Sequence, residues 1–330
     1  MEKYLLHEYN DMQRRYFIDS QMLYRTYIEK LLRYKNELRY GMFWQKSKGN
    51  DYLVRAVSRD GKRKYLGRRD ADTERIYHAF IERRNREKAS LATLKNKLSE
   101  VAKINKAVRL ARLPADTSKI LHKINQLGLN DKFIIIGTFS LYAYEAMAGI
   151  FIEERHLSAF DIDIRNRRAK NISVSFKEEL PTGSILELFQ SIDPTFELNP
   201  KASYQVINPS GVRIDFINPI NRTGPNQCDI IELEINGIEW LQNCRPISET
   251  IIDTSGRPCI MTVLHPLDFS IYKRWLSEQP SREPIKRERD AVQSDIVREI
   301  IRRYLPHINI EEELKKRKQF PKRLIGDYKS

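Results

Sequence analysis

The feature that most limits the fold of this chain is a glycine-containing turn followed by two alternating strands that carry carboxylates. The apolar run 133–136 precedes the turn and predicts a buried strand that leads into a helix. The first acidic strand contains Asp161 and Asp163, and the second contains Asp215. We therefore expect a sheet domain in which three carboxylates gather beside a strand-to-helix turn.

The turn at Gly137 and Thr138 has the features of a phosphate-binding junction. The first N–H groups of a helix lack partners within the helix, so they attract anions. Gly137 allows the backbone to approach a phosphate closely, and Thr138 is expected to cap the helix and to offer its hydroxyl to a phosphate oxygen. A plain strand–turn–helix with a capping threonine has the same pattern, and this alternative stays open.

The two aspartates of the predicted strand 160–164 lie two residues apart, so both side chains point to one face. Asp161 and Asp163 repel each other unless a cation neutralises them. Two Mg²⁺ ions would do so and would polarise a phosphoryl group between the attacking and leaving oxygens. Asp215 would complete the metal site or act as base for the attacking hydroxyl. A solvated acidic strand and a surface pair of Asp215 with Arg213 are the alternatives.

Charge is distributed unevenly along the chain. Residues 1–113 carry a net charge of +14, residues 114–270 carry −6, and residues 271–330 carry +6. An acidic centre suits metal ions and basic ends suit a polyanion, although solvated charged helices have the same composition. The three cysteines match no zinc pattern or disulfide framework. No apolar stretch approaches the roughly 18 residues of a membrane span, so we expect a cytoplasmic location without a membrane partner.

Periodicity predicts a chain in three parts: a basic helical module, a sheet core of the α/β or α+β class and a C-terminal helical module, and of the two classes we expect α+β. The predicted boundaries are 1–113, 114–245 and 246–330. The expected elements are a helix over 3–40, a β-hairpin over about 42–69, a helix over 74–110, a hairpin over 247–263, and helices over 265–276 and 282–304.

The hairpin at about 42–69 is basic and aromatic, with Trp44, Tyr52 and Tyr65 between its cations. Such a surface can follow phosphates and stack bases. A small packed sheet with a solvated outer face is the alternative. The candidate residues for binding nucleic acid are Arg55, Arg63, Lys64, Arg68 and Arg69.

The segments Gly137-Thr138 and Asp161-Ile162-Asp163, together with Asp215, resemble the DNA polymerase β-like nucleotidyltransferase superfamily. Its pattern is a strand, a Gly-Ser or Gly-Gly turn, a helix, a D-x-D strand and a later strand with a third aspartate. The resemblance implies a small mixed sheet flanked by helices, and transfer of a nucleoside monophosphate from an NTP with Mg²⁺ or Mn²⁺. It implies these roles: Asp161, Asp163 and Asp215 bind metal and catalyse, and Gly137, Thr138 and Ser140 bind the nucleotide.

Lys273 and Asp290, on the two predicted C-terminal helices, extend this resemblance to nucleotidyltransferase-fold toxins and abortive-infection proteins of bacteria. The resemblance implies that Lys273 binds the triphosphate and that Asp290 orients it or the acceptor. An ordinary helix surface with salt bridges between residues four apart is the alternative. The region from Trp44 to Gly67 also resembles a group of bacterial proteins with a nucleotidyltransferase fold.

These observations lead to a metal-dependent nucleotidyltransferase as the first hypothesis. RNA is the expected acceptor, with a tRNA 3′ end the best candidate because the flanks are basic. A toxin–antitoxin or phage-defence setting, with a toxin or antitoxin as partner protein, is part of this hypothesis. AMPylation of a protein hydroxyl is the enzymatic alternative. A regulator with a degenerate site that binds nucleotides or nucleic acid is the alternative from another class; Thr138 and the long spacing to Asp161 favour it.

Overall fold

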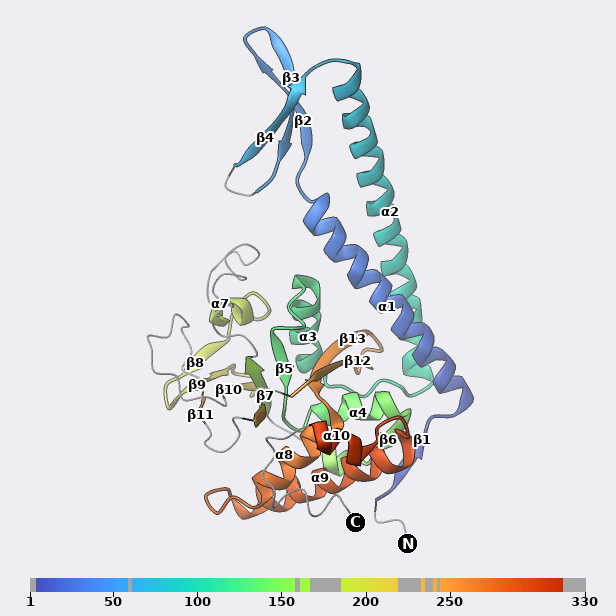
Figure 1. Ribbon diagram of the computed structural model, residues 1–330, viewed down its shortest axis with the longest axis vertical. Helices are drawn as coiled ribbons and strands as arrows, with labels where there is room; N and C mark the ends of the chain where they lie inside the picture. Colours follow the sequence, from blue (N-terminus) through green and yellow to red (C-terminus); the bar gives the residue numbers. More distant parts are fainter. Residues whose placement is uncertain are drawn as a thin grey trace.

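An elongated arm of two helices rises from a rounded body that contains the central sheet (Figure 1). The computed structural model describes residues 4–58, 61–157, 161–166, 185–218, 233–234, 240–241 and 244–316, without the side chains of 161–166, 203–204, 217–218 and 233–234. The fold is α+β, as the sequence predicts. Within the described ranges, no helix is both long and apolar enough to cross a bilayer.

The arm consists of the antiparallel helices α1 (Asp11–Glu37) and α2 (Ala71–Ala107). Both begin at a capping box, in which the side chain at the N-cap accepts a hydrogen bond from the third helical N–H. Asn10 caps α1 and Asp70 caps α2. Both long helices were predicted from periodicity, and their ends differ from the prediction by only a few residues except at the start of α1, where Leu6–Glu8 forms the strand β1.

A three-stranded antiparallel sheet lies at the tip of the arm (Figure 1). Its strands are β2 (Met42–Ser47), β3 (Asn50–Ala56) and β4 (Arg63–Arg68). The sequence predicted only a two-stranded hairpin here. The additional strand β2 joins β3 through Lys48 and Gly49, which have φ angles of 46° and 81° and make the tight two-residue turn that such a hairpin needs.

The body contains an eight-stranded mixed sheet in the order β12-β13-β5-β7-β10-β9-β8, with β11 paired to β10. Helices α8 and α9 pack against each other, and α9 also contacts α4 and α5. Strand β1 pairs with β6 beside α4. The strands of the body are β5 (Phe133–Ile135), β6 (Ile150–Ile152), β7 (Asp161–Asn166), β8 (Glu197–Asn199), β9 (Ala202–Ile207), β10 (Arg213–Asn218), β11 (Leu233–Glu234), β12 (Pro246–Ile252) and β13 (Pro258–Leu264). Its helices are α3 (Ala115–Leu127), α4 (Ser140–Ala148), α5 (Glu154–Leu157), α7 (Ile185–Gln190), α8 (Pro266–Ser277), α9 (Pro284–Tyr304) and α10 (Ile310–Lys316).

The hairpin β12–β13 extends the central sheet, because β13 pairs in parallel with β5. The predicted boundary at residues 245 and 246 therefore falls just before two strands that share the sheet of the core. The turn of this hairpin also forms a hydrogen bond with the arm. Asn105 of α2 donates hydrogen bonds to the carbonyl of Gly256 and to the hydroxyl of Ser20 on α1, each over 2.9 Å.

Candidate active site

The backbone register brings the glycine turn and the acidic strands to one edge of the sheet. Strand β7 is antiparallel to β5, with Ile164 opposite Ile135, so β7 begins where the chain leaves β5 for the turn. Strand β10 is parallel to β7, and Asp215 lies opposite Asp163. Facing positions of neighbouring strands belong to the same side of a sheet. Positions 163 and 215 therefore share a side, which the sequence alone could not determine.

Asp215 is held by a hydrogen bond from the neighbouring strand. Nε2 of Gln205 on β9 donates to Oδ1 of Asp215 over 2.6 Å, and Asn199 donates to Oε1 of Gln205 over 2.6 Å. The residues on either side of Asp215, Ile214 and Phe216, are fully buried on the opposite side of the sheet. Sequence analysis missed Gln205. Its position opposite Asp215 depends on the β9–β10 register, which the sequence does not display.

The other two carboxylates are placed by their backbone alone, since the side chains of Asp161 and Asp163 lie outside the described part of the chain. Among the described residues, no group of three His, Cys, Asp or Glu side chains could hold a metal ion. The oxygen donors of a site built from the three aspartates suit a hard divalent cation such as Mg²⁺ or Mn²⁺. The metal site therefore stays a prediction that the register favours.

Thr138 does not cap helix α4, so this prediction is wrong. The N-cap is Phe139, without a side-chain hydrogen bond. The hydroxyl of Thr138, only 4% exposed, instead accepts a hydrogen bond of 3.2 Å from Gln293 on α9. The chain enters the helix through tight i→i+3 bonds, and the N–H groups of Ser140 and Leu141 bond to the carbonyls of Gly137 and Thr138.

Ser140 is fully buried, and its hydroxyl donates to the carbonyl of Ile135 over 2.9 Å. This hydrogen bond joins the first turn of α4 to the end of β5. In this arrangement the Ser140 hydroxyl stabilises the turn, and the nucleotide-binding role that the resemblance implied stays a prediction.

Lys273 and Asp290 form a buried ion pair between helices α8 and α9. Nζ of Lys273 lies 2.8 Å from Oδ1 of Asp290, and the two side chains are 2% and 0% exposed. Arg282 pairs with the second oxygen, Oδ2, of Asp290. The ammonium of Lys273 also lies 5.6 Å from the ring centre of Phe269. The alternative of an ordinary exposed salt bridge within one helix is excluded for this pair, because its members come from different helices and are buried.

One face of α9 connects this ion pair to the glycine turn. Asp290 contacts Lys273. Gln293 donates hydrogen bonds to Thr138 and to the carbonyl of His156. Ser294 forms a hydrogen bond with Ser270 of α8. These three residues of α9 are spaced as one helical face. Helix α9 thus contacts the turn that the sequence singled out, and the ion pair of Lys273 with Asp290 joins α8 to α9.

The five basic candidates of the arm are divided between the two sides of the small sheet. The outer side carries Arg63 and Arg68, opposite Ala56 and Tyr52 of β3. It also carries two exposed aromatic side chains, Phe43 and Tyr65, which are 36% and 56% exposed. Arg63 and Tyr65 both donate to Gln45, over 3.2 and 3.3 Å. This outer side combines exposed rings with cations.

The other three candidates do not lie on this outer side. Two of them make contacts within the arm, and the third lies on the side of the sheet that faces the helices. Arg55 donates to the carbonyl of Glu37 over 2.7 Å and lies over the ring of Phe80 on α2. Lys64 is exposed opposite Arg55, on the side of the sheet that faces the helices. Arg69 pairs with Glu74 over 2.8 Å and stacks on Trp44. The basic surface is therefore narrower than the sequence predicted.

The fold and site define an α+β protein whose candidate site is a carboxylate-bearing sheet edge beside a strand-to-helix turn. The chain belongs to a nucleotidyltransferase family, because residues 115–318, more than half of it, match the family described as nucleotidyltransferase. The matched segment contains the turn, the acidic strands and helices α8 and α9. In comparisons with curated proteins and with solved structures, none matches the chain.

Proposed function

We propose that this chain is a divalent-metal-dependent nucleotidyltransferase with a polymerase β-like core, which moves a nucleoside monophosphate from an NTP to an acceptor hydroxyl. The observation that carries the proposal is the register that sets Asp215 opposite Asp163 at the edge where the Gly137 turn begins. Membership of a nucleotidyltransferase family supports the same reaction class.

The acidic residues would hold the metal and the triphosphate. Asp161 and Asp163 would bind Mg²⁺ or Mn²⁺, and Asp215, oriented by Gln205, would complete the site or accept the proton of the attacking hydroxyl. The bound ions would neutralise the phosphates and polarise the phosphoryl group. Gly137 and the backbone of Thr138 would approach the phosphates.

Lys273 and Asp290 take a positioning role in this proposal. Their ion pair is buried and satisfied within the protein, so Lys273 would act on the site through α9 and its contact with Thr138. A triphosphate contact by Lys273, as the resemblance implied, would require its ammonium to leave Asp290.

RNA is the proposed acceptor, with a tRNA 3′ end as the leading candidate. The outer side of the β2–β4 sheet offers Phe43 and Tyr65 for stacking and Arg63 and Arg68 for phosphates. Helix α2, with 37 residues, is about 55 Å long at 1.5 Å per residue. A sheet carried at the tip of such an arm favours a long acceptor that contacts both arm and body. The toxin–antitoxin or phage-defence setting and a partner toxin or antitoxin remain part of this proposal.

The experiment is incubation of the full chain with each α-³²P-labelled NTP, Mg²⁺ or Mn²⁺, and total RNA or cell lysate. We expect label in RNA that a ribonuclease removes. Label that only a protease removes would replace RNA by a protein hydroxyl as acceptor. Nucleotide binding without transfer under any condition would favour the degenerate regulator and overturn the enzymatic proposal.

A further inference from the structure

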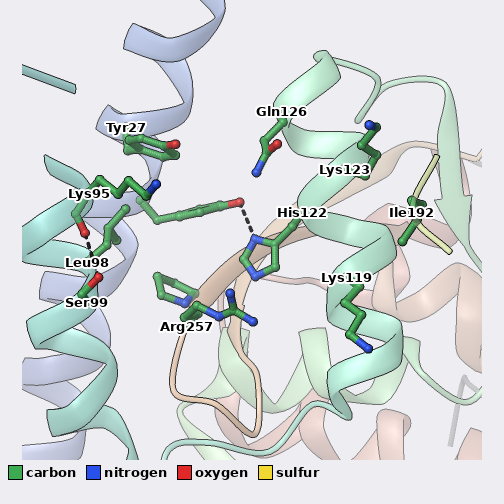
Figure 2. Close-up of a pocket in the computed structure, with 12 residues that line it drawn as sticks. Tyr27, Lys95, Leu98, Ser99, Lys119, His122, Lys123, Gln126, Ile192 and Arg257 are labelled. Carbon is green, nitrogen blue, oxygen red and sulfur yellow. Dashed lines mark hydrogen bonds between the residues drawn. The ribbon is translucent and has the colours of Figure 1, made fainter. Parts of the chain in front are cut away.

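A cavity of about 420 Å³ lies at the junction between arm and body (Figure 2). The arm supplies Tyr27 and Lys95 on one side, and α3 supplies His122 and Lys123 on the other. The β12–β13 turn contributes Arg257. The volume is in the range of pockets that hold small molecules.

Basic side chains line this cavity, and two of them are paired with carboxylates. Lys95, Lys119, Lys123 and Arg257 line it, and no Asp or Glu side chain is among its described lining residues. Lys119 pairs with Asp116 over 3.0 Å. Within the described part of the chain, neither Lys95 nor Lys123 forms an ion pair, so both can neutralise an anionic ligand.

One acidic group behind the wall is paired with Arg257, a cation of the cavity. Asp253 is fully buried and accepts hydrogen bonds from Ser118, from Ser255 and from the N–H of Arg257. Burial alone would raise the pKa of this carboxyl, but the His122 ring, whose Nε2 lies 3.6 Å from Oδ2, and the hydrogen bonds from Ser255 and Ser118 hold the pKa well below its usual value. Asp253 therefore stays a carboxylate and offsets the charge of Arg257, so Lys95 and Lys123 are the described lining cations that remain for a ligand.

Aromatic rings line the arm side of the cavity. Tyr24 and Tyr27 lie with ring centres 6.2 Å apart. The hydroxyl of Tyr24 is fixed by hydrogen bonds of 3.0 Å to His122 and to Asn125. Tyr27 is half-buried, and its ring is available for packing. Rings beside several cations suit a ligand that has both a planar base and a phosphate.

The cavity is separate from the candidate active site. Pro258, the first residue of β13, lines the cavity, whereas the glycine turn follows the C-terminal end of β5, which runs parallel to β13. The two sites thus lie toward opposite ends of β13, whose seven residues span about 23 Å.

We propose that this cavity is a second binding site, for a nucleoside phosphate that is either free or the 5′ end of an RNA strand. The base packs against Tyr27 and the phosphate binds the neighbouring Lys95, while Lys123 on the opposite wall adds to the positive potential. Because its walls come from both arm and body, an occupied cavity stabilises their docking through the binding free energy. The inference does not depend on the proposed transferase activity.

The test uses the full-length Asp161→Ala/Asp163→Ala variant in EDTA, so that metal-dependent binding at the other site is silenced. The four nucleoside 5′-monophosphates, inorganic phosphate and a 5′-phosphorylated hexanucleotide RNA are titrated by calorimetry. We expect saturable binding of at least one monophosphate. Adding Lys95→Glu and Lys123→Glu should weaken it more than about tenfold, since the charged contact with Lys95 is worth about 1.5 kcal/mol or more and Lys123 adds to the potential.

Matched controls distinguish the loss of a ligand contact from an effect of net charge and from a failure to fold. Lys97→Glu with Lys103→Glu makes the same change of four charge units at exposed residues of α2 outside the cavity and should leave affinity unchanged. Tyr27→Phe should retain affinity and Tyr27→Ala should reduce it to that for inorganic phosphate. Thermal denaturation confirms that each variant folds.

Each outcome has a defined meaning. Hexanucleotide binding tighter than monophosphate binding assigns the site to an RNA end, and monophosphate binding without hexanucleotide binding assigns it to a free nucleotide. The proposal is overturned by the absence of saturable binding, by equal affinity in the Lys95→Glu/Lys123→Glu and Lys97→Glu/Lys103→Glu proteins, or by phosphate binding as tightly as any nucleotide.

Discussion

The ammonium of Lys273 lies 2.8 Å from the carboxylate of Asp290, at the buried contact between α8 and α9. Three residues further along α9, Gln293 holds the hydroxyl of Thr138 in the glycine turn. The ion pair therefore supports the helix that braces the candidate site. A substitution of Lys273 should therefore lower the stability of the protein. The family resemblance had instead implied weaker substrate binding.

We expect Lys273→Ala to lower the free energy of unfolding by about 3–5 kcal/mol, because removing one partner leaves a buried charge partly uncompensated. Urea denaturation measures this. Lys286→Ala, which removes an exposed lysine paired with Glu283, is the control and should cost less than about 1 kcal/mol. A Lys273→Ala protein of unchanged stability that requires much more NTP would restore the direct triphosphate contact.

Glu145 should make stability depend on pH. Its carboxyl is fully buried, and burial, opposed by Arg112, raises its pKa from an ordinary 4.5 to about 7. The folded protein thus holds a proton that the unfolded chain releases between these values. This contribution to stability is complete below pH 4.5 and is lost as the pH rises to about 7. Glu145→Gln keeps an oxygen for Arg112 and for the N–H of Ile152, and should flatten the profile in urea titrations between pH 4.5 and 8. An unchanged slope would contradict this origin.

Gly256 should not tolerate a side chain. A Cβ at this position would lie 1.9 Å from the carbonyl oxygen of Ala102 on α2. Gly211 has nearly the same φ, 86° against 84°, but nothing within 4 Å of its Cβ position. Both alanine variants carry the backbone strain, so Gly256→Ala should cost about 1–3 kcal/mol more than Gly211→Ala, through the clash alone. Equal melting temperatures of the Gly256→Ala and Gly211→Ala proteins would contradict this close contact between the turn and α2.

The outer side of the arm sheet should bind RNA in a salt-dependent way. Arg63→Glu with Arg68→Glu should weaken binding and flatten the slope of log affinity against log salt by about 0.7 for each RNA phosphate that the variant no longer neutralises. Lys46 lies on the side of this sheet that faces the helices, so Lys46→Glu serves as the control. Fluorescence anisotropy with labelled RNA at several salt concentrations measures both. The arm would have a structural or protein-binding role if the slope stayed the same.

Sequence periodicity located the long helices, the acidic strands and the C-terminal helices, because each is set by local alternation of apolar and polar residues. It could not show which strands face each other, so Gln205 was missed. It also placed the basic residues of the arm on one surface. A bulge between β3 and β4, where the register shifts at Leu53 and Val54, instead sets Arg68 on the side of Arg63 and away from Lys64.

The same limit applies to Lys273. The helical spacing of charges around it fits an exposed face or a ligand contact equally well. Only the packing of α8 on the following helix α9, which depends on the angle of the turn between them, shows that its partner is Asp290. Likewise, Thr138 follows the capping pattern, but the approach of Gln293 redirects its hydroxyl. Tertiary contacts decide both cases.

The central claim, nucleotidyl transfer at the edge shared by β7 and β10, is tested most directly by comparing the rates of label transfer from α-³²P-NTP to RNA in matched variants. We predict that Asp163→Ala and Asp215→Ala each lower the rate more than about 100-fold, that Gln205→Ala has a smaller effect, and that Asp116→Ala, at an exposed carboxylate on α3, has none. All four proteins should melt near the parent temperature. Transfer at the parent rate by a folded Asp163→Ala or Asp215→Ala protein would contradict the account.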